Sequence, residues 1–133
     1  ESIIASTIPY PKTLSPNTKD RVDYPDFAAK VCENVLKEEG SKGILICGSG
    51  IGMSMAANKF DGIRAALCHN EYSAKMAREH NDANVICLGE RVSGYGMVEA
   101  IIDSWNDSSF EGGRHESRVE KINALSKIGS CRV

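Results

Sequence analysis

The sequence predicts an α/β fold with three layers, in which a parallel sheet carries helices on both faces. Short apolar runs recur at residues 43 to 47, 63 to 68 and 84 to 89. These runs are continuous rather than alternating, which is typical of strands that are covered on both faces. Segments with helical periodicity separate the runs, and strands that alternate with helices form βαβ units.

Each expected helix has its own sequence signal. Pro25 stands in the first turn of a helix that we expect to end at Gly40, since proline favours the first turn and glycine the end of a helix. Further helices are expected after the glycine-rich segment at 48 to 52, from about 71 to 80, from about 96 to 106 and from about 116 to 127. Apolar residues recur at helical spacing in the last two.

The first 22 residues fit this alternation poorly. Ile3, Ile4 and Ala5 make a weak apolar segment, and Pro9, Pro11 and Pro16 prevent a long regular element. We therefore expect an irregular or truncated segment over 1–22, one domain over 23–128 and a tail over 129–133.

Composition narrows the functional classes. A chain of 133 residues with 41% hydrophobic content can build one core. Its 16 basic and 18 acidic residues give a formal net charge of -2, which predicts no nucleic-acid partner. No apolar stretch has the length of a bilayer span, so we expect no membrane contact, a cytoplasmic location and a small-molecule substrate.

The cysteines and histidines predict neither disulfides nor a metal cofactor. The five cysteines form no Cys-x-x-Cys pair, and their odd number argues for a reducing compartment. The three histidines, at positions 69, 80 and 115, show no zinc-type spacing.

The strongest candidate for chemistry is Cys47, which stands between an apolar strand and the glycine-rich segment Gly48, Ser49, Gly50, Ile51 and Gly52. Glycines allow backbone N–H groups to approach a ligand closely, and the start of the next helix favours negative charge. A phosphate, a carboxylate or an oxyanion suits this loop. The same dipoles stabilise a thiolate, so Cys47 can act as a base or a nucleophile, although a small buried residue closing a strand is the structural alternative.

The loop differs from two common nucleotide loops. No Gly-Lys-Ser/Thr follows it, and Met53 stands where the dinucleotide fingerprint has glycine. A smaller anion is therefore expected. In a parallel sheet, the ligand site lies beyond the carboxyl ends of the strands, which places Cys47 near Gly89 and Arg91.

Two other groups are candidates. Arg114 and Arg118 are four residues apart at the start of the last helix and can reach one anion, unless they simply form a solvated basic face. His80 ends a helix, where it is either a proton carrier or a residue favoured by the helix dipole.

Several segments together resemble the type B ribose-5-phosphate isomerases, a family that includes the galactose-6-phosphate isomerase subunits. The resemblance rests on the segments at 23–26, 46–52, 56–59, 62–65, 78–84 and 111–115 and spans residues 22 to about 125. It implies a Rossmann-like fold and the interconversion of aldose and ketose sugar phosphates without a metal or other cofactor.

The resemblance also implies residue roles. Cys47 matches the base that moves a proton between C2 and C1, and Gly48 to Gly52 match the loop that holds the enediolate. His80 matches the acid–base residue for ring opening, with Asn81 beside it on the substrate. Arg91, Arg114 and Arg118 match substrate and phosphate contacts. Members are homodimers or dimers of dimers whose sites draw on both subunits.

One departure leaves alternatives open. The family begins with a strand ending in Asp-His, which is absent near the start of this sequence, where residues 1–6 look more like the helix that follows that strand. Ribose 5-phosphate isomerisation is the expected activity. A galactose-6-phosphate or other hexose-phosphate isomerase, a non-catalytic sugar-phosphate-binding protein and, more weakly, redox sensing by Cys47 are the alternatives.

Overall fold

The protein is described here from a computed structural model, in which residues 4–8, 17 and 20–129 are placed. In chain order the elements are β1 (Ile4–Ile8), α1 (Tyr24–Lys37), β2 (Lys42–Cys47), α2 (Ile51–Ala57), β3 (Ala65–Leu67), α3 (Glu71–Glu79), β4 (Val85–Gly89), α4 (Tyr95–Asp107), a 3-10 turn η1 (Gly113–His115) and α5 (Glu116–Gly129).

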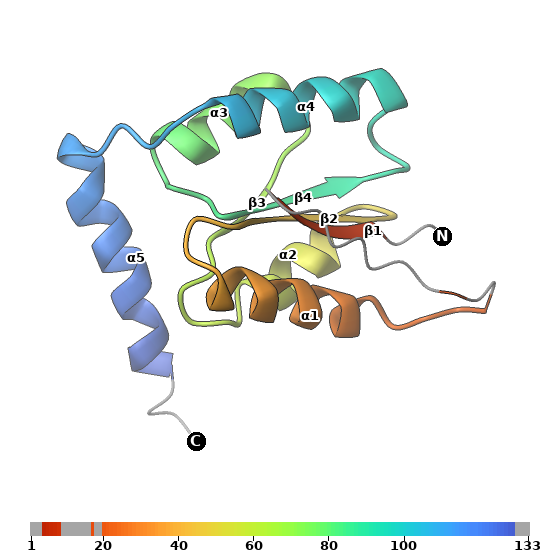
Figure 1. The fold of residues 1–133 in the computed structure, drawn as a ribbon, viewed down its shortest axis with the longest axis horizontal. Helices are drawn as coiled ribbons and strands as arrows, with labels where there is room; N and C mark the ends of the chain where they lie inside the picture. Colours follow the sequence, from red (N-terminus) through yellow and green to blue (C-terminus); the bar gives the residue numbers. More distant parts are fainter. Residues whose placement is uncertain (1–3, 9–16, 18–19, 130–133) are drawn as a thin grey trace.

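The predicted three layers are confirmed. The sheet has the strand order β1-β2-β4-β3, and β2, β4 and β3 run parallel. Helices α1 and α2 cover one face and α3 and α4 the other, while α5 stands beside the layers (Figure 1). Residues 130–133, most of the expected tail, lie outside the described residues.

The interpretation of the N-terminal segment was wrong in one respect. Residues 4–8 form a strand rather than an irregular segment or a helix, and the strand pairs antiparallel with β2, with Ile4 opposite Ile46 and Ile8 opposite Lys42. A short edge strand needs only one neighbour for its backbone hydrogen bonds, so the weak apolar signal is sufficient. The prolines that argued against regular structure, Pro9, Pro11 and Pro16, lie outside the described residues.

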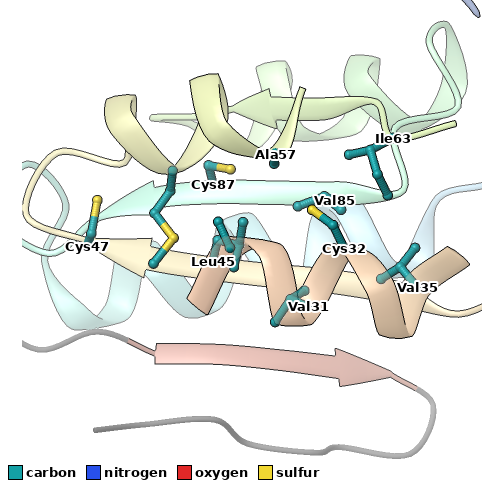
Figure 2. Close-up of a cluster of buried hydrophobic side chains, with 11 residues drawn as sticks. Val31, Cys32, Val35, Leu45, Cys47, Ala57, Ile63, Val85 and Cys87 are labelled. Carbon is teal, nitrogen blue, oxygen red and sulfur yellow. The ribbon is translucent and has the colours of Figure 1, made fainter. Parts of the chain in front are cut away.

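Alternating side chains of β2 and β4 build two cores, one on each face. Leu45, Val85 and Cys87 pack under α1 and α2 with Val31 and Cys32, as Figure 2 shows for the buried cluster. Ile86 and Leu88 pack on the opposite face with α3 and α4, where Trp105 is fully buried. Burial of a side chain of this size stabilises the fold by roughly 1.5–3 kcal/mol. Both faces of β4 are therefore covered, which explains its continuous apolar sequence.

Among the described residues, no helix combines the length and apolar character that a bilayer crossing requires.

Candidate functional site

Cys47 is the last residue of β2 and lies at the edge of the buried cluster, at the arrowhead end of the strand (Figure 2). The loop that follows it is tied to the loop after β4. Glu90 N donates to the Cys47 carbonyl oxygen at 2.9 Å, and Arg91 N donates to the Gly48 carbonyl oxygen at 3.1 Å. The carboxyl ends of two neighbouring parallel strands thus hold the cysteine in a fixed position, as predicted for this topology.

Gly50 directs its backbone N–H at the thiol of Cys47. The Gly50 N to Cys47 Sγ distance is 3.2 Å, and Gly50 has a φ of 78°. A Cβ at this position would lie 2.7 Å from the Leu67 side chain and 2.8 Å from the Leu88 backbone, so only glycine fits the turn. The donated hydrogen bond fixes the position of the sulfur relative to the loop.

A cavity of about 590 Å³ opens in front of this thiol. Most of the predicted loop residues and Arg91 contribute to its wall, while Gly50 contributes its N–H behind the sulfur. The lining residues are Arg21, Val22, Asp23, Tyr24, Cys47, Gly48, Ser49, Ile51, Gly52, Met55, Arg91 and Val92. We refer to it as the cysteine cavity.

Sequence reasoning missed the wall formed by the start of α1. Tyr24 lies against Gly52 so closely that a Cβ on Gly52 would be 2.5 Å from the Tyr24 hydroxyl oxygen. Arg21 and Asp23 precede Tyr24 in the same wall. The segment 23–26 had been noted as part of the resemblance, and this was the available signal, but no role had been assigned to it.

The remaining predicted residues form a second group around His80. The His80 and His115 rings stack with their centroids 4.1 Å apart and an interplanar angle of 12°. Glu111 Oε2 lies 3.9 Å from His80 Nε2 and 3.6 Å from His115 Nε2. Burial lowers the pKa of His115, and His80, Arg114 and Arg118 lower it further, while the Glu111 carboxylate partly opposes them. Arg114 in η1 and Arg118 in α5 are therefore close enough to act on this group electrostatically.

Asn81 faces another space. It lines a cavity of about 520 Å³ beside α5, together with Phe60, Ile63, Ile122 and Leu125. Glu111 and His115 were not predicted as functional residues. Their signal was again a segment of the resemblance, 111–115, from which only Arg114 had been assigned.

The turn that carries His80 and Asn81 is held by an ionic network. Asp82 has a φ of 48°, a conformation that few residues other than glycine adopt. Its carboxylate lies 3.0 Å from the Arg78 guanidinium and 3.3 Å from that of Arg64. Arg64 Nε also donates to the Asp82 carbonyl oxygen at 2.9 Å. These contacts fix the left-handed residue and hence the direction of the His80–Asn81 segment.

Within one chain the two groups lie at opposite ends of the sheet. Cys47 pairs with Gly89 at the carboxyl end of β4, whereas His80 precedes Val85 at the amino end. The five residues of β4 alone span about 13 Å at roughly 3.3 Å per residue. The structure therefore brings together Cys47, its loop and Arg91, and separately His80, Arg114 and Arg118, but it does not unite the two sets.

Comparison with known proteins identifies the family and supports the fold. A model of the ribose/galactose isomerase family matches residues 9–122. The chain belongs to the ribose/galactose isomerase family. It is thus an isomerase of the aldose–ketose class, an intramolecular oxidoreductase.

Members of the ribose/galactose isomerase family with curated names are similar over most of the chain. Ribose-5-phosphate isomerase B of Escherichia coli (strain K12) is 49% identical over 108 residues, which are 81% of this chain and 72% of that protein. D-erythrulose-4-phosphate isomerase of Pectobacterium atrosepticum is 50% identical over 99 residues, or 74% of this chain and 65% of that protein.

A solved structure in the ribose/galactose isomerase family agrees with the fold described above. Type B ribose 5-phosphate isomerase from Trypanosoma cruzi superposes with a TM-score of 0.82 at 52% identity. The superposition covers 85% of this chain and 76% of the other. The resemblance inferred from the sequence motifs is confirmed.

Proposed function

We propose that this chain interconverts ribose 5-phosphate and ribulose 5-phosphate, with Cys47 as the base that transfers the proton. The observation that carries the proposal is the Gly50 N–H directed at Cys47 Sγ, 3.2 Å away, at the wall of the cysteine cavity. This contact holds the sulfur at the wall of the cavity, where a bound sugar carbon can come within reach of a base. Because that thiol must stay reduced, we place the protein in the cytoplasm.

The proposed reaction moves one proton between two carbons and one between two oxygens, and it needs no cofactor. The Cys47 thiolate removes the proton from C2 of the open-chain aldose, and the electron pair forms the C1–C2 double bond of an enediolate. The thiol then returns the proton to C1, while a proton moves between the two oxygens, which gives the ketose. Amides of the loop from Gly48 to Gly52 stabilise the negative oxygen of the enediolate.

His80 is assigned to opening the sugar ring, by proton transfer to the ring oxygen and from the C1 hydroxyl group. Imidazole is suited to both directions near neutral pH. Asn81 is assigned to the substrate hydroxyl groups. Arg91, Arg114 and Arg118 are assigned to the substrate and its phosphate, since guanidinium groups match the geometry of phosphate oxygens.

A second copy of the chain completes the site in this proposal. Ring opening breaks the bond between C1 and the ring oxygen, so His80 must act within a bond or two of the carbons that Cys47 serves. In one chain the two residues lie at opposite ends of β4. Exposed apolar side chains occur at both ends, with Ile51, Met55 and Val92 at the cysteine cavity and Ile122 and Leu125 on α5. We therefore infer a homodimer, alone or as part of a dimer of dimers, with shared sites.

The decisive test is Cys47→Ala in a coupled assay of ribose 5-phosphate turnover. We expect kcat to fall about 10²- to 10⁴-fold, the usual contribution of a positioned base. The matched control is Cys32→Ala, which removes a fully buried thiol under α1 and should leave turnover close to that of the wild type. Wild-type kcat in Cys47→Ala would refute the assignment.

Two observations support other candidates, which the same protein can decide. One relative is named for D-erythrulose 4-phosphate, and the family description names both ribose and galactose. Turnover should therefore be measured with tetrose, pentose and hexose phosphates, including galactose 6-phosphate. The separation of His80 from Cys47 in one chain favours a sugar-phosphate-binding protein without turnover. Calorimetric binding of ribose 5-phosphate by a chain that converts none of these sugars would establish that alternative.

A further inference from the structure

Three side chains that can bind a metal ion meet where α3 ends beside η1. His80 Nε2 and His115 Nε2 lie 3.9 Å and 3.6 Å from the same oxygen, Oε2 of Glu111. The ligand atoms of all three residues lie within 4.8 Å of one another. We propose that His80, Glu111 and His115 bind a divalent transition metal of the zinc class, and that the bound metal inhibits the isomerase.

The donor set fits this class of metal. Two imidazole nitrogens and one carboxylate oxygen are a common zinc ligand set, which leaves a fourth position for water or another ligand. With metal–ligand bonds of about 2.0–2.2 Å, ligand atoms around a tetrahedral ion lie about 3.4 Å apart. The distances to the Glu111 oxygen exceed this by only a few tenths of an ångström, which the half-exposed Glu111 side chain can supply. Both separations are too long for a hydrogen bond, so a metal ion would not have to break one between these atoms. The two imidazole rings are stacked with their planes 12° apart, so the His80 ring, whose side chain is 34% exposed, must also rotate to direct Nε2 at an ion bound by His115.

Backbone contacts hold the three residues in place without a metal. Glu111 N donates to the Glu79 carbonyl oxygen at 3.0 Å, which fixes Glu111 beside His80. His115 N donates to the Gly112 carbonyl oxygen at 3.0 Å, and its side chain is only 8% exposed. Gly112 has a φ of 66°, a conformation that turns η1 back toward α3. Metal binding then requires a rotation of the His80 ring and a movement of the Glu111 side chain but no rearrangement of the backbone, which limits the entropy lost on binding.

The positive charges near His115 are expected to weaken its affinity for a metal ion. Arg114 and Arg118 act on His115 and disfavour a second positive charge there. Binding should therefore be reversible and weaker than at a closed structural zinc site. This agrees with a reaction that needs no metal.

Inhibition rests on the role of His80 in the proposed function. A metal on His80 Nε2 occupies the electron pair that the residue uses to accept a proton. It also places positive charge where the sugar ring must approach.

The test titrates the full, metal-stripped chain with zinc chloride by calorimetry and with cobalt(II) by visible absorption. The variant is Glu111→Gln, which keeps the size of the side chain and removes the charged ligand oxygen. The matched control is His69→Gln, since His69 is exposed and lies outside the triad. Cys47→Ala is a second control, because a thiolate also binds zinc.

We expect zinc affinity to fall at least about tenfold in Glu111→Gln, since even outer-shell partners contribute about 10- to 100-fold. Wild type, His69→Gln and Cys47→Ala should bind alike. Turnover of ribose 5-phosphate should be inhibited by zinc in the wild type and His69→Gln, and require at least about tenfold more zinc in Glu111→Gln.

The proposed metal site is refuted if Glu111→Gln binds zinc as tightly as the wild type does. It is also refuted if Cys47→Ala abolishes zinc binding. Saturated binding with undiminished turnover overturns the inhibition. If the metal-free wild type turns over no sugar phosphate, the isomerase proposal fails, and the binding data still decide the metal site.

Discussion

Mixing two inactive variants tests whether the active site is shared between chains. Cys47→Ala removes the proposed base, and His80→Ala removes the proposed ring-opening residue at the other end of β4. If each site takes Cys47 from one chain and His80 from its partner, a mixed dimer contains one site with both residues native and one with neither. Co-refolding the two variants should therefore restore activity that neither has alone.

The magnitude follows from the symmetry of such a dimer. With equal amounts and random pairing, half of the dimers are mixed, and one of their two sites is intact. About one quarter of wild-type activity should return, independent of how little each variant retains. The proposed roles of Cys47 and His80 lead to this expectation, because the span of β4, about 13 Å, exceeds the roughly 3 Å over which an acid or base acts directly.

The assay is ribose 5-phosphate turnover per site, measured after refolding at several mixing ratios. The control mixes Cys47→Ala with a chain carrying both substitutions, a combination that cannot form an intact site. Restoration in the control, or no restoration in the mixture while sedimentation shows mixed dimers, would contradict the shared site.

Other substitutions test the supports of the site. Gly50→Ala should destabilise the fold by roughly 1–3 kcal/mol in urea unfolding, because of the positive φ and the contact with Leu88. The control is Gly96→Ala in α4, where a Cβ meets nothing, and it should not destabilise the fold. Asp82→Asn keeps a residue that tolerates the left-handed turn but removes the charge between Arg64 and Arg78, so we expect a loss of roughly 1–3 kcal/mol by the same measurement; an unchanged unfolding midpoint would show that the network is dispensable. Burial raises the pKa of Cys32 to about 12 and that of Cys87 still further, so both remain thiols at pH 8. Iodoacetamide followed by peptide mapping should modify Cys47 before Cys32 and Cys87, with loss of turnover, and faster labelling of Cys32 would count against this.

The parallel part of the fold could be predicted because burial on both faces leaves a direct trace in sequence. Ile86, Cys87 and Leu88 face different cores yet are all apolar, so β4 stands out as an unbroken run. The edge strand β1 left no such trace. One neighbouring strand supplies its backbone partners, and such pairing does not depend on side-chain type. No local sequence pattern specifies its antiparallel direction.

The part of the site that is formed by residues close together in the sequence could be predicted. Cys47 and Gly50 are three residues apart, so the loop that joins them can be recognised from its glycines. The triad was not predictable in this way. His80 and His115 are separated by all of β4 and α4, and the spacing of histidines therefore predicted no metal ligands. Tertiary contacts, such as the hydrogen bond from Glu111 N to the Glu79 carbonyl oxygen, bring the two segments together.

The separation of the two groups follows from the topology itself. In a parallel sheet, a connection that leaves a strand begins at its carboxyl end, and a connection that enters the next strand arrives at its amino end. The Cys47 loop is of the first kind, and the segment from His80 to Asn84 is of the second. No adjustment of side chains can bring them together within one chain. A two-fold axis can, because it places the amino end of one sheet against the carboxyl end of another and does so twice. The apolar residues of α5, Ile122 and Leu125, would then cover Ile51 and Met55 beside the partner's cysteine cavity. In such an arrangement, dimerisation and catalysis depend on the same surface, so a substitution such as Leu125→Asp should lower both together.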